Sequence, residues 1–222
     1  MSDTLAIVPV RAGSKGLPGK NLRPIAGEAL WLRAARQGAR MADRVIVTTD
    51  ATDILQAAPE PGTAHLRRPP ELARDDTPMA PVLMHALSGV PDDTRVVLLQ
   101  PTSPLRTDAD IAAGLRLYGE GGWSMVMSVT EADRGVLKWG RVEDGRFLPL
   151  GRAGDSFANR QALPPVVRPN GAVYVFAAGA FRDAGGFPSK RIGVTLMPEA
   201  RALDIDDLAS FDEAERRLAA GG

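Results

Sequence analysis

The first stretch with residues able to do chemistry is a glycine-spaced basic loop near the start of the chain. It reads RAGSKGLPGKN from Arg11 to Asn21 and contains three cations, Arg11, Lys15 and Lys20. Glycines let backbone N–H groups approach phosphate oxygens, and each charge-assisted bond from a cation would add roughly 1.5–3 kcal/mol. The pattern predicts a loop that binds a triphosphate, with an ordinary basic surface loop as the open alternative.

The spacing in this loop excludes two common nucleotide motifs. A Walker A loop has four residues between its first glycine and the Gly-Lys pair, followed by Ser or Thr. Here five residues separate Gly13 from Gly19, and Asn21 stands where the hydroxyl should be. A Rossmann G-x-G-x-x-G is also absent, because no glycine lies two residues from Gly13 or Gly16. The position of the loop, between a predicted strand and a predicted helix, favours phosphate binding.

A pair of carboxylates near the other end of the chain is the second informative stretch. In an extended segment alternate side chains share a face, so Asp204 and Asp206 would point together while Ile205 points into the core. Two carboxylates on one face suit magnesium, which takes oxygen ligands alongside substrate phosphates. Helix capping, worth about 1 kcal/mol, is the alternative. Asp207 alone could cap the next helix, and composition leaves both interpretations open.

Alternating strands and helices must position these two stretches. Apolar runs predict strands over 5–10, 44–49, 95–99, 171–176 and 192–197. A weaker strand is predicted at 65–67, and alternation of apolar and small polar residues predicts a half-exposed strand over 123–130. Helical spacing predicts helices over 28–42, 52–58, 81–87 and 208–219, and one that contains Ile111. The face of the last helix would carry Leu208, Phe211, Ala214 and Leu218. This alternation predicts an α/β fold with a doubly wound, mainly parallel sheet.

Several polar residues are expected at the ends of these elements. Ligands of open α/β sheets bind beyond the carboxyl ends of strands, where Gln100 and Arg106 follow a predicted strand. Asp50 could cap the short helix that comes after it. Thr107 and Asp110 resemble a capping pair for the next long helix.

The alternation of strands and helices is lost between about 131 and 168. Turn signals there, such as EDG at 143–145, predict hairpins that form an insertion. Its cations include Lys138, Arg160 and, at its end, Arg168. Each of these, taken alone, is interpreted as a solvated surface charge.

Composition narrows the class of protein. The 222 residues suit one α/β domain, and 27 Lys and Arg balance 27 Asp and Glu, which argues against a nucleic-acid or anionic-membrane surface. There are no cysteines, so disulfides and thiol chemistry are excluded. His65 and His85 have no second histidine at ligand spacing and are interpreted as structural or surface residues. No signal or membrane-spanning segment is evident at the start, so a cytoplasmic protein is expected.

Five motifs resemble, in order, those of the acylneuraminate cytidylyltransferase family, the CMP-sialic acid synthetases. They are RAGSKGLPGKN at 11–21, RPPELA at 68–73, LLQPTSPLR at 98–106, RPNGAVY at 168–174 and DID at 204–206. The resemblance extends from Leu5 to about Glu215. It implies a single nucleotidyltransferase domain over 1–222, of the nucleotide-diphospho-sugar transferase type. It also implies a homodimer in which the insertion, about 131–168, contributes to dimerisation and reaches the neighbouring active site.

The resemblance further implies an activity and a set of site residues. A nine-carbon 2-keto acid sugar would react with CTP, with the help of Mg²⁺, to give a CMP-sugar and pyrophosphate. The triphosphate would be held by Arg11, Ala12, Gly13, Ser14, Lys15 and Lys20, and ribose and cytosine would meet Asn21 and Arg68. The sugar would contact Gln100, Lys138, Arg160 and Arg168, with Lys138 and Arg160 coming from the partner subunit. Asp204 and Asp206 would hold the metal, and Arg11, Lys20 and Asp206 would be catalytic.

Two departures from the family pattern leave the sugar open. Some members have Gln-Asn where this chain has Ala12-Gly13, and a Gly-containing version occurs in bacterial enzymes for legionaminic or pseudaminic acid. The stretch 75–84 lacks the serine pair that some members place near the base. The alternatives are a cytidylyltransferase for another acid sugar (legionaminic acid, pseudaminic acid, KDN or Kdo) and a non-catalytic nucleotide-binding module on the same fold.

Overall fold

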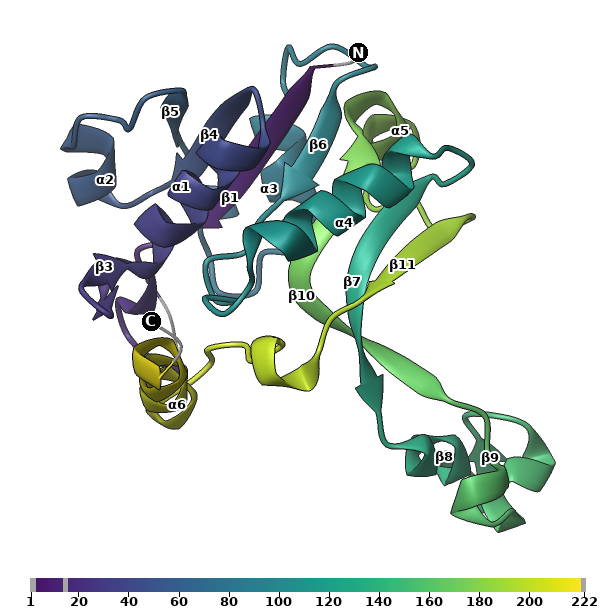
Figure 1. The fold of residues 1–222 in the computed structure, drawn as a ribbon. Helices are drawn as coiled ribbons and strands as arrows, with labels where there is room; N and C mark the ends of the chain where they lie inside the picture. Colours follow the sequence, from purple (N-terminus) through teal and green to yellow (C-terminus); the bar gives the residue numbers. More distant parts are fainter. Residues whose placement is uncertain (1–2, 14–15, 221–222) are drawn as a thin grey trace.

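A mixed sheet of seven strands runs through the described part of the chain, residues 3–13 and 16–220 of a computed structural model (Figure 1). In sheet order the strands are β11 (Ile192–Leu196), β7 (Met125–Ala132), β10 (Val166–Ala177), β6 (Arg95–Leu98), β1 (Thr4–Val10), β4 (Arg44–Thr49) and β5 (Thr63–Arg67). Strand β10 is antiparallel to both of its neighbours, and the other strand pairs are parallel. The predicted mainly parallel sheet is therefore confirmed.

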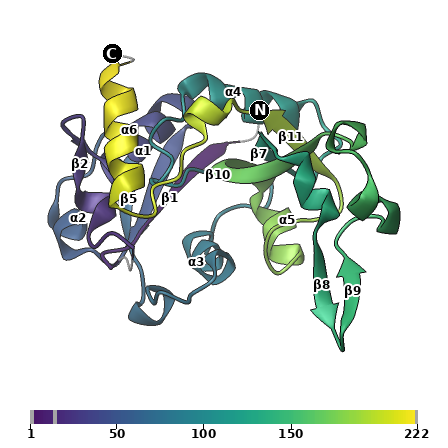
Figure 2. The same cartoon turned by 90° about the horizontal axis from the view of Figure 1, so that it is seen from below.

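Helices cover both faces of this sheet (Figure 2). One face packs against α1 (Leu30–Met41), α2 (Thr52–Gln56) and α4 (Asp108–Gly119). The other face packs against α3 (Met79–Ala86) and α5 (Ala178–Asp183). Every residue of β1 is buried, as expected for a central strand with both faces covered.

A third apolar cluster lies outside the sheet and joins the two ends of the chain. Its buried members are Leu17, Ile25, Leu30, Ile205, Phe211 and Ala214. Helix α6 (Leu208–Ala220) packs here against β2 (Pro24–Ile25), which pairs with β3 (Glu28–Ala29). Leu208 was predicted on the buried face of this helix but is 52% exposed, because the first residue of the helix lies outside the cluster.

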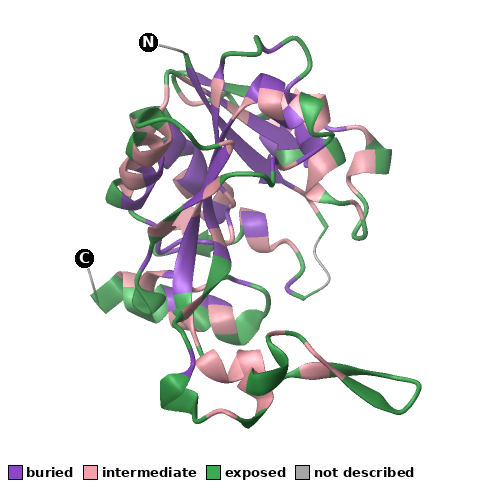
Figure 3. Cartoon of the chain, turned by 90° about the vertical axis from the view of Figure 1, so that its right-hand side faces the viewer, coloured by how far each residue is buried: buried purple, intermediate pink, exposed green. Residues whose placement is uncertain are grey.

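The predicted insertion projects from the body of the molecule (Figure 1). It begins where β7 and β10 pair beyond the main sheet, with Val166 opposite Ala132. It contains the hairpin of β8 (Gly140–Glu143) and β9 (Arg146–Pro149), and short 3-10 helices at Arg134–Lys138, Ala153–Phe157 and Arg160–Ala162. Most of its surface is exposed, in contrast to the sheet (Figure 3).

Several boundaries differ from those predicted. The strand expected over 171–176 begins earlier, at Val166, and its register shifts between Pro169 and Tyr174 instead of starting at a turn. β7 is mostly buried, not half-exposed, because it lies between β10 and β11. In the loop after Arg68, residues Pro70–Leu72 form a short 3-10 helix. No helix in the described residues is long and apolar enough to cross a membrane.

Candidate nucleotide site

A cavity of about 220 Å³ opens at the carboxyl ends of the central strands. The chain passes from β1 to β4 on one side and later adds β6 on the other side of β1, so the strand order changes direction at β1. Ligands of open α/β sheets usually bind at such a point. Both ends of the chain contribute to its lining, which consists of Pro9, Arg11, Lys20, Asn21, Arg68, Met79, Gln100, Pro101, Thr102, Asp204 and Asp206. Seven of these residues were singled out from the sequence as site candidates.

The basic loop and the acid pair are in direct contact. Lys20 Nζ lies 3.4 Å from Asp206 Oδ1 and also donates a hydrogen bond to the carbonyl of Ile205. Gly16 packs so closely on the same segment that a Cβ there would lie 2.1 Å from the carbonyl oxygen of Asp206. Leu17 and Ile205 share the third apolar cluster. Burial of two such side chains, worth about 1.5–3 kcal/mol each, gives a physical reason for the ends to meet.

The two carboxylates have different surroundings. Ile205 between them is fully buried, and both Asp204 and Asp206 line the cavity, as the alternation predicted. Protein atoms around Asp204 displace water and raise the pKa of its carboxyl group, and the charge of Asp206 raises that pKa further. A hydrogen bond from Thr102 and the charge of Lys20 oppose this shift. A cation placed between the two acids would therefore stabilise the ionised form of Asp204.

Helix capping is performed by the neighbouring acid. Asp207 Oδ1 accepts the backbone N–H of Ser210 at 2.8 Å in the first turn of α6. Because Asp207 caps the helix, Asp204 and Asp206 are not needed as caps. Of the two interpretations of this stretch, this arrangement is compatible with magnesium binding.

Arg68 and Asn21 form the opposite wall. Arg68 is 5% exposed, donates from Nη2 to the Thr48 carbonyl at 2.8 Å, and has a pKa lowered by burial. Asn21 donates from Nδ2 to the Arg11 carbonyl at 3.1 Å, while its buried Oδ1 finds no donor among the described residues. A buried acceptor without a partner is costly, so this atom suits a donor group on a ligand.

Arg11 is held at the rim of the cavity. Its Nη1 lies 2.7 Å from Asp75 Oδ1 and 3.4 Å from the carbonyl oxygen of Arg74. The backbone next to it is fixed by Asp50, which accepts the N–H of Ala12 at 2.9 Å. The predicted role of Asp50 as a helix cap is wrong, because α2 has Ala51 at its N-cap and no side-chain cap.

Comparison with known proteins assigns the family. A family model described as "Cytidylyltransferase" matches residues 5–136, which is more than half of the chain. The chain belongs to the cytidylyltransferase family. The resemblance drawn from the five motifs is thereby confirmed at the level of the family.

Relatives of this chain include two proteins named N-acylneuraminate cytidylyltransferase. That of Escherichia coli is 32% identical over 214 residues and that of Streptococcus agalactiae 28% identical over 211, covering 95% and 93% of this chain. The chain spans about half the length of these relatives, 51% in each case. The post-translational flagellin modification protein B of Campylobacter coli is 25% identical over 225 residues, covering 97% of this chain and 94% of that protein.

Two solved structures of cytidylyltransferase-like fold superimpose over nearly the whole chain. A CMP:2-keto-3-deoxy-manno-octonic acid synthetase complexed with CTP has a TM-score of 0.77 at 15% identity and covers 100% of both chains. A 4-diphosphocytidyl-2C-methyl-D-erythritol synthase has a TM-score of 0.66 at 11% identity and covers 98% of this chain and 99% of that chain. These likenesses agree with the predicted fold.

Not every predicted site residue lies in the cavity. Lys138, Arg160 and Arg168 do not line it within one chain, and Arg160 Nη2 instead lies 3.0 Å from Asp133 in the insertion. Ala12 and Gly13 also lie outside its lining. Ser14 and Lys15 fall outside the described residues.

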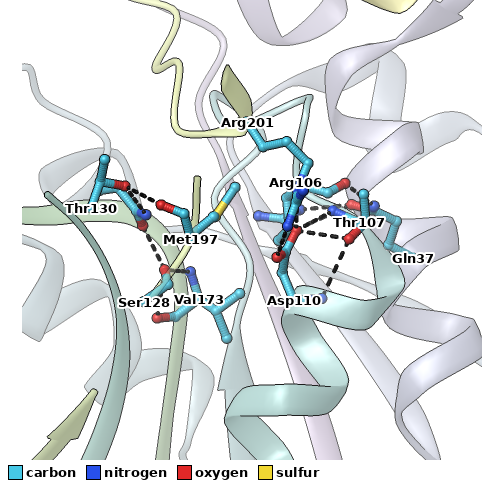
Figure 4. A network of polar contacts seen from close by, with 10 residues as sticks. Gln37, Arg106, Thr107, Asp110, Ser128, Thr130, Val173, Met197 and Arg201 are labelled. Atoms are coloured by element: carbon cyan, nitrogen blue, oxygen red, sulfur yellow. Dashed lines mark hydrogen bonds and ion pairs between the residues drawn. The ribbon is translucent and has the colours of Figure 1, made fainter. Parts of the chain in front are cut away.

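Arg106 was expected to face a ligand but is a buried structural residue. It is 2% exposed and donates to Gln37 Oε1 at 3.0 Å (Figure 4). It also donates to the Gln100 carbonyl at 3.1 Å and to the Ala172 carbonyl at 2.7 Å. Its guanidinium group therefore fixes the backbone of Gln100 and that of Ala172 on β10, and the Gln100 side chain lies against Gly171.

Four lining residues were not predicted from the sequence: Pro9, Met79, Pro101 and Thr102. Thr102 binds the carboxylate of Asp204, and its carbonyl accepts the N–H of Ile205 at 2.8 Å. The signal available for Thr102 was its place in the PTS segment directly after Gln100, at the end of a predicted strand.

Proposed function

We propose that the protein is a nucleotidyltransferase that activates an acid sugar, of the nine-carbon N-acylneuraminate type, with CTP, giving a CMP-sugar and pyrophosphate. The observation that carries this proposal is the meeting of Lys20 and Asp206 in one cavity, in a chain of the cytidylyltransferase family. Cations on one side and carboxylates on the other suit a nucleotide triphosphate that carries a divalent cation.

The triphosphate lies along the basic loop in this proposal. Arg11 and Lys20 line the cavity and bring positive charge to it. Phosphate contacts from Ala12, Gly13, Ser14 and Lys15 stay predictions from the sequence of the loop. The side chain of Lys20 is only 12% exposed and is already held by Ile205 and Asp206. Charge fixed before the substrate arrives is the main source of transition-state stabilisation in this type of transfer.

Ribose and cytosine occupy the wall formed by Asn21 and Arg68. The unpaired Oδ1 of Asn21 accepts a hydrogen bond from a ribose hydroxyl or from the amino group of the base. Arg68 carries only donors, and these suit the oxygen and ring nitrogen acceptors of cytosine. A buried, prepositioned guanidinium group loses little freedom on binding.

The acid pair fits Mg²⁺. Asp204 and Asp206 offer carboxylate oxygens, and the raised pKa of Asp204 is a strain that a bound cation would relieve. The described residues contain no group of three or more His, Cys, Asp or Glu side chains that could hold a metal, so phosphate oxygens and water would complete the coordination. When bound, Mg²⁺ would neutralise phosphate charge and lower the pKa of the attacking hydroxyl.

The residues of the chain then orient an in-line displacement. The anomeric hydroxyl oxygen of the sugar forms a bond to the α-phosphorus while the bond from that phosphorus to the β-phosphate oxygen breaks, and pyrophosphate leaves with the electron pair. Arg11 and Lys20 stabilise the charge that develops on pyrophosphate. Neither His65 nor His85 lines the cavity, so an aspartate or a hydroxide ion is the proposed acceptor of the hydroxyl proton.

The sugar binds beyond Gln100, at the end of β6. The names of two relatives support a sialic acid, since they are N-acylneuraminate cytidylyltransferases. Legionaminic acid, pseudaminic acid, KDN and Kdo are the alternatives, because a relative of similar length carries a flagellin-modification name and the two motif departures remain.

A homodimer completes the site in this proposal. The insertion exposes large apolar side chains, with Phe157 90%, Trp139 64% and Phe147 53% exposed, and exposed apolar groups of this size are typical of protein interfaces. Lys138 and Arg160 of one subunit, which do not line the cavity of their own chain, would meet the sugar carboxylate in the partner's cavity, and Arg168 would bind the same sugar. A cytoplasmic location also stays a prediction.

A substrate panel tests the proposal. The full chain is incubated with Mg²⁺ and CTP, one acid sugar at a time, and pyrophosphate release and CMP-sugar formation are measured. We expect N-acetylneuraminate to give the highest kcat/KM. A higher kcat/KM with another acid sugar would identify that sugar as the substrate. CTP binding without turnover on any sugar would support the non-catalytic module. Pyrophosphate release without CMP-sugar formation would contradict both the cytidylyltransferase and the non-catalytic module.

A further inference from the structure

The segment that carries the acid pair has no regular secondary structure of its own. Residues 202–206 lie between a 3-10 helix at Glu199–Arg201 and helix α6. Among the described residues, two backbone hydrogen bonds hold this segment: the Ala202 N–H donates to the Glu199 carbonyl at 3.1 Å and the Ile205 N–H to the Thr102 carbonyl at 2.8 Å. Metal-binding carboxylates need a fixed backbone, so side-chain contacts must supply the remaining restraint.

One such contact is an ion pair of Arg201, three residues before Asp204. Arg201 donates from Nη2 to Asp110 Oδ1 at 2.7 Å and from Nε to Asp110 Oδ2 at 3.1 Å (Figure 4). A two-bond pair of this kind fixes orientation as well as distance. The Asp110 side chain is 9% exposed, so water competes little for it.

Asp110 is itself immobilised at the start of α4. Its Oδ2 accepts the N–H of Thr107 at 2.9 Å and the hydroxyl of Thr107 at 2.8 Å, and Thr107 Oγ1 accepts the N–H of Asp110, which is a capping box. The loop before Thr107 carries Gln100 and ends at the buried Arg106. The ion pair therefore joins the acid-bearing segment to the same rigid loop that carries Gln100.

We propose that Arg201 and Asp110 are positioning residues for the acid pair, and that their ion pair sets where Asp204 and Asp206 lie relative to the nucleotide cavity. The proposal rests on the proposed function for its catalytic consequence, but its structural part concerns the free protein alone. Loss of partners that orient metal ligands typically costs about 10–100-fold in metal affinity or activity.

Hydrogen exchange of the metal-free full chain tests the structural part. Arg201→Ala should speed exchange of the amides of Ile205, Asp206 and Asp207, which are bonded to the Thr102 carbonyl and to Ser210 Oγ. Arg201→Lys keeps the charge but not the two-bond geometry, and should give an intermediate effect even if the alanine variant folds poorly. Asp110→Asn should act like Arg201→Ala, and combining both should add little.

The matched control is another arginine that joins two segments far from the cavity. Arg182 donates to the carbonyls of Leu87 and Val90 and pairs with Asp92. Arg182→Ala should lower thermal stability without changing exchange at 205–207.

A Mn²⁺ titration in the presence of CTP, followed by electron paramagnetic resonance, tests the functional part. We expect the dissociation constant for Mn²⁺ to rise about 10-fold or more in Arg201→Lys, with less change in the affinity for CTP measured without metal. Unchanged exchange at 205–207 together with unchanged Mn²⁺ affinity would overturn the proposal. Failure of the wild type to form any CMP-sugar would overturn the proposed function instead, while the exchange result would still decide the structural role of the pair.

Discussion

Lys20 Nζ and Asp206 Oδ1 lie 3.4 Å apart although 186 positions separate the two residues in the chain. Their contact brings the basic loop and the acid pair into one cavity. If the two stretches act on one nucleotide, changes to either should affect CTP binding and turnover, whereas changes elsewhere on the surface should not.

Lys20→Ala removes the cation that the structure holds best in the cavity. We expect turnover to fall by about 10²–10³-fold, because a prepositioned charge at the departing pyrophosphate is lost. Circular dichroism and thermal unfolding should remain near those of the wild type. Lys190→Ala, at an exposed lysine outside the cavity, is the control. Near-normal CMP-sugar formation by Lys20→Ala would refute the assignment of this residue.

Gly16→Ala tests the contact between the two ends of the chain. The new methyl group would lie 2.1 Å from the Asp206 carbonyl oxygen, so backbone must move, at a cost of about 1–3 kcal/mol in unfolding free energy. We also expect KM for CTP to rise, because the loop and the acid pair are displaced together. Gly119→Ala is the control, since a Cβ there meets nothing within 4 Å at the end of α4. A Gly16→Ala protein as stable as the control would show that the contact is looser than described.

Asp204 gives a pH dependence whose sign follows from its raised pKa. The folded protein keeps a proton on this carboxyl at pH values where the unfolded chain has lost it, so without metal its contribution to stability falls as pH rises through that window. Asp204→Asn should therefore raise the melting temperature of the metal-free protein at neutral pH while it abolishes tight metal binding. In the wild type, Mn²⁺ affinity should decline on acidification already above the usual aspartate pKa. A melting temperature lowered by Asp204→Asn would contradict this explanation.

Arg106→Gln tests whether that arginine is structural. Three buried acceptors would lose a donor, at about 1–3 kcal/mol for each group left unsatisfied. We expect a loss of several kcal/mol in urea denaturation. Arg40→Gln, which removes an exposed ion pair with Asp108, should cost less than about 1 kcal/mol. Equal stability of the two variants would return Arg106 to the list of ligand-binding candidates.

Local features of the fold were predicted well because their signals are local. The run over 44–49 is strand β4 without change, and the pairing of Thr107 with Asp110 is a complete capping box. Both depend only on side chains within a few residues of each other. The position of the acid pair beside the basic loop depends instead on Leu17 and Ile205, which meet in a cluster formed by distant segments. The five motifs predicted that juxtaposition, whereas periodicity alone did not.

The wrong expectations have a common physical origin. Asp50 and Arg106 both satisfy backbone groups of segments far away in the chain, the N–H of Ala12 and the carbonyl of Ala172. Each of these residues follows a strand, so it was interpreted as a cap of the next helix or as a ligand contact, both of which can be inferred from nearby sequence. Partners that come close only through tertiary packing cannot be inferred in this way. The Arg201–Asp110 pair was not predicted for the same reason.

A crystal structure of the full chain with CTP and Mg²⁺ would show directly whether the basic loop and the acid pair bind one nucleotide. We predict the triphosphate between Lys20 and the acid pair, with the metal bound to Asp204 and Asp206 and the base beside Asn21 and Arg68. Nucleotide bound elsewhere on the molecule, or in the cavity with its phosphates turned away from Lys20, would contradict the account.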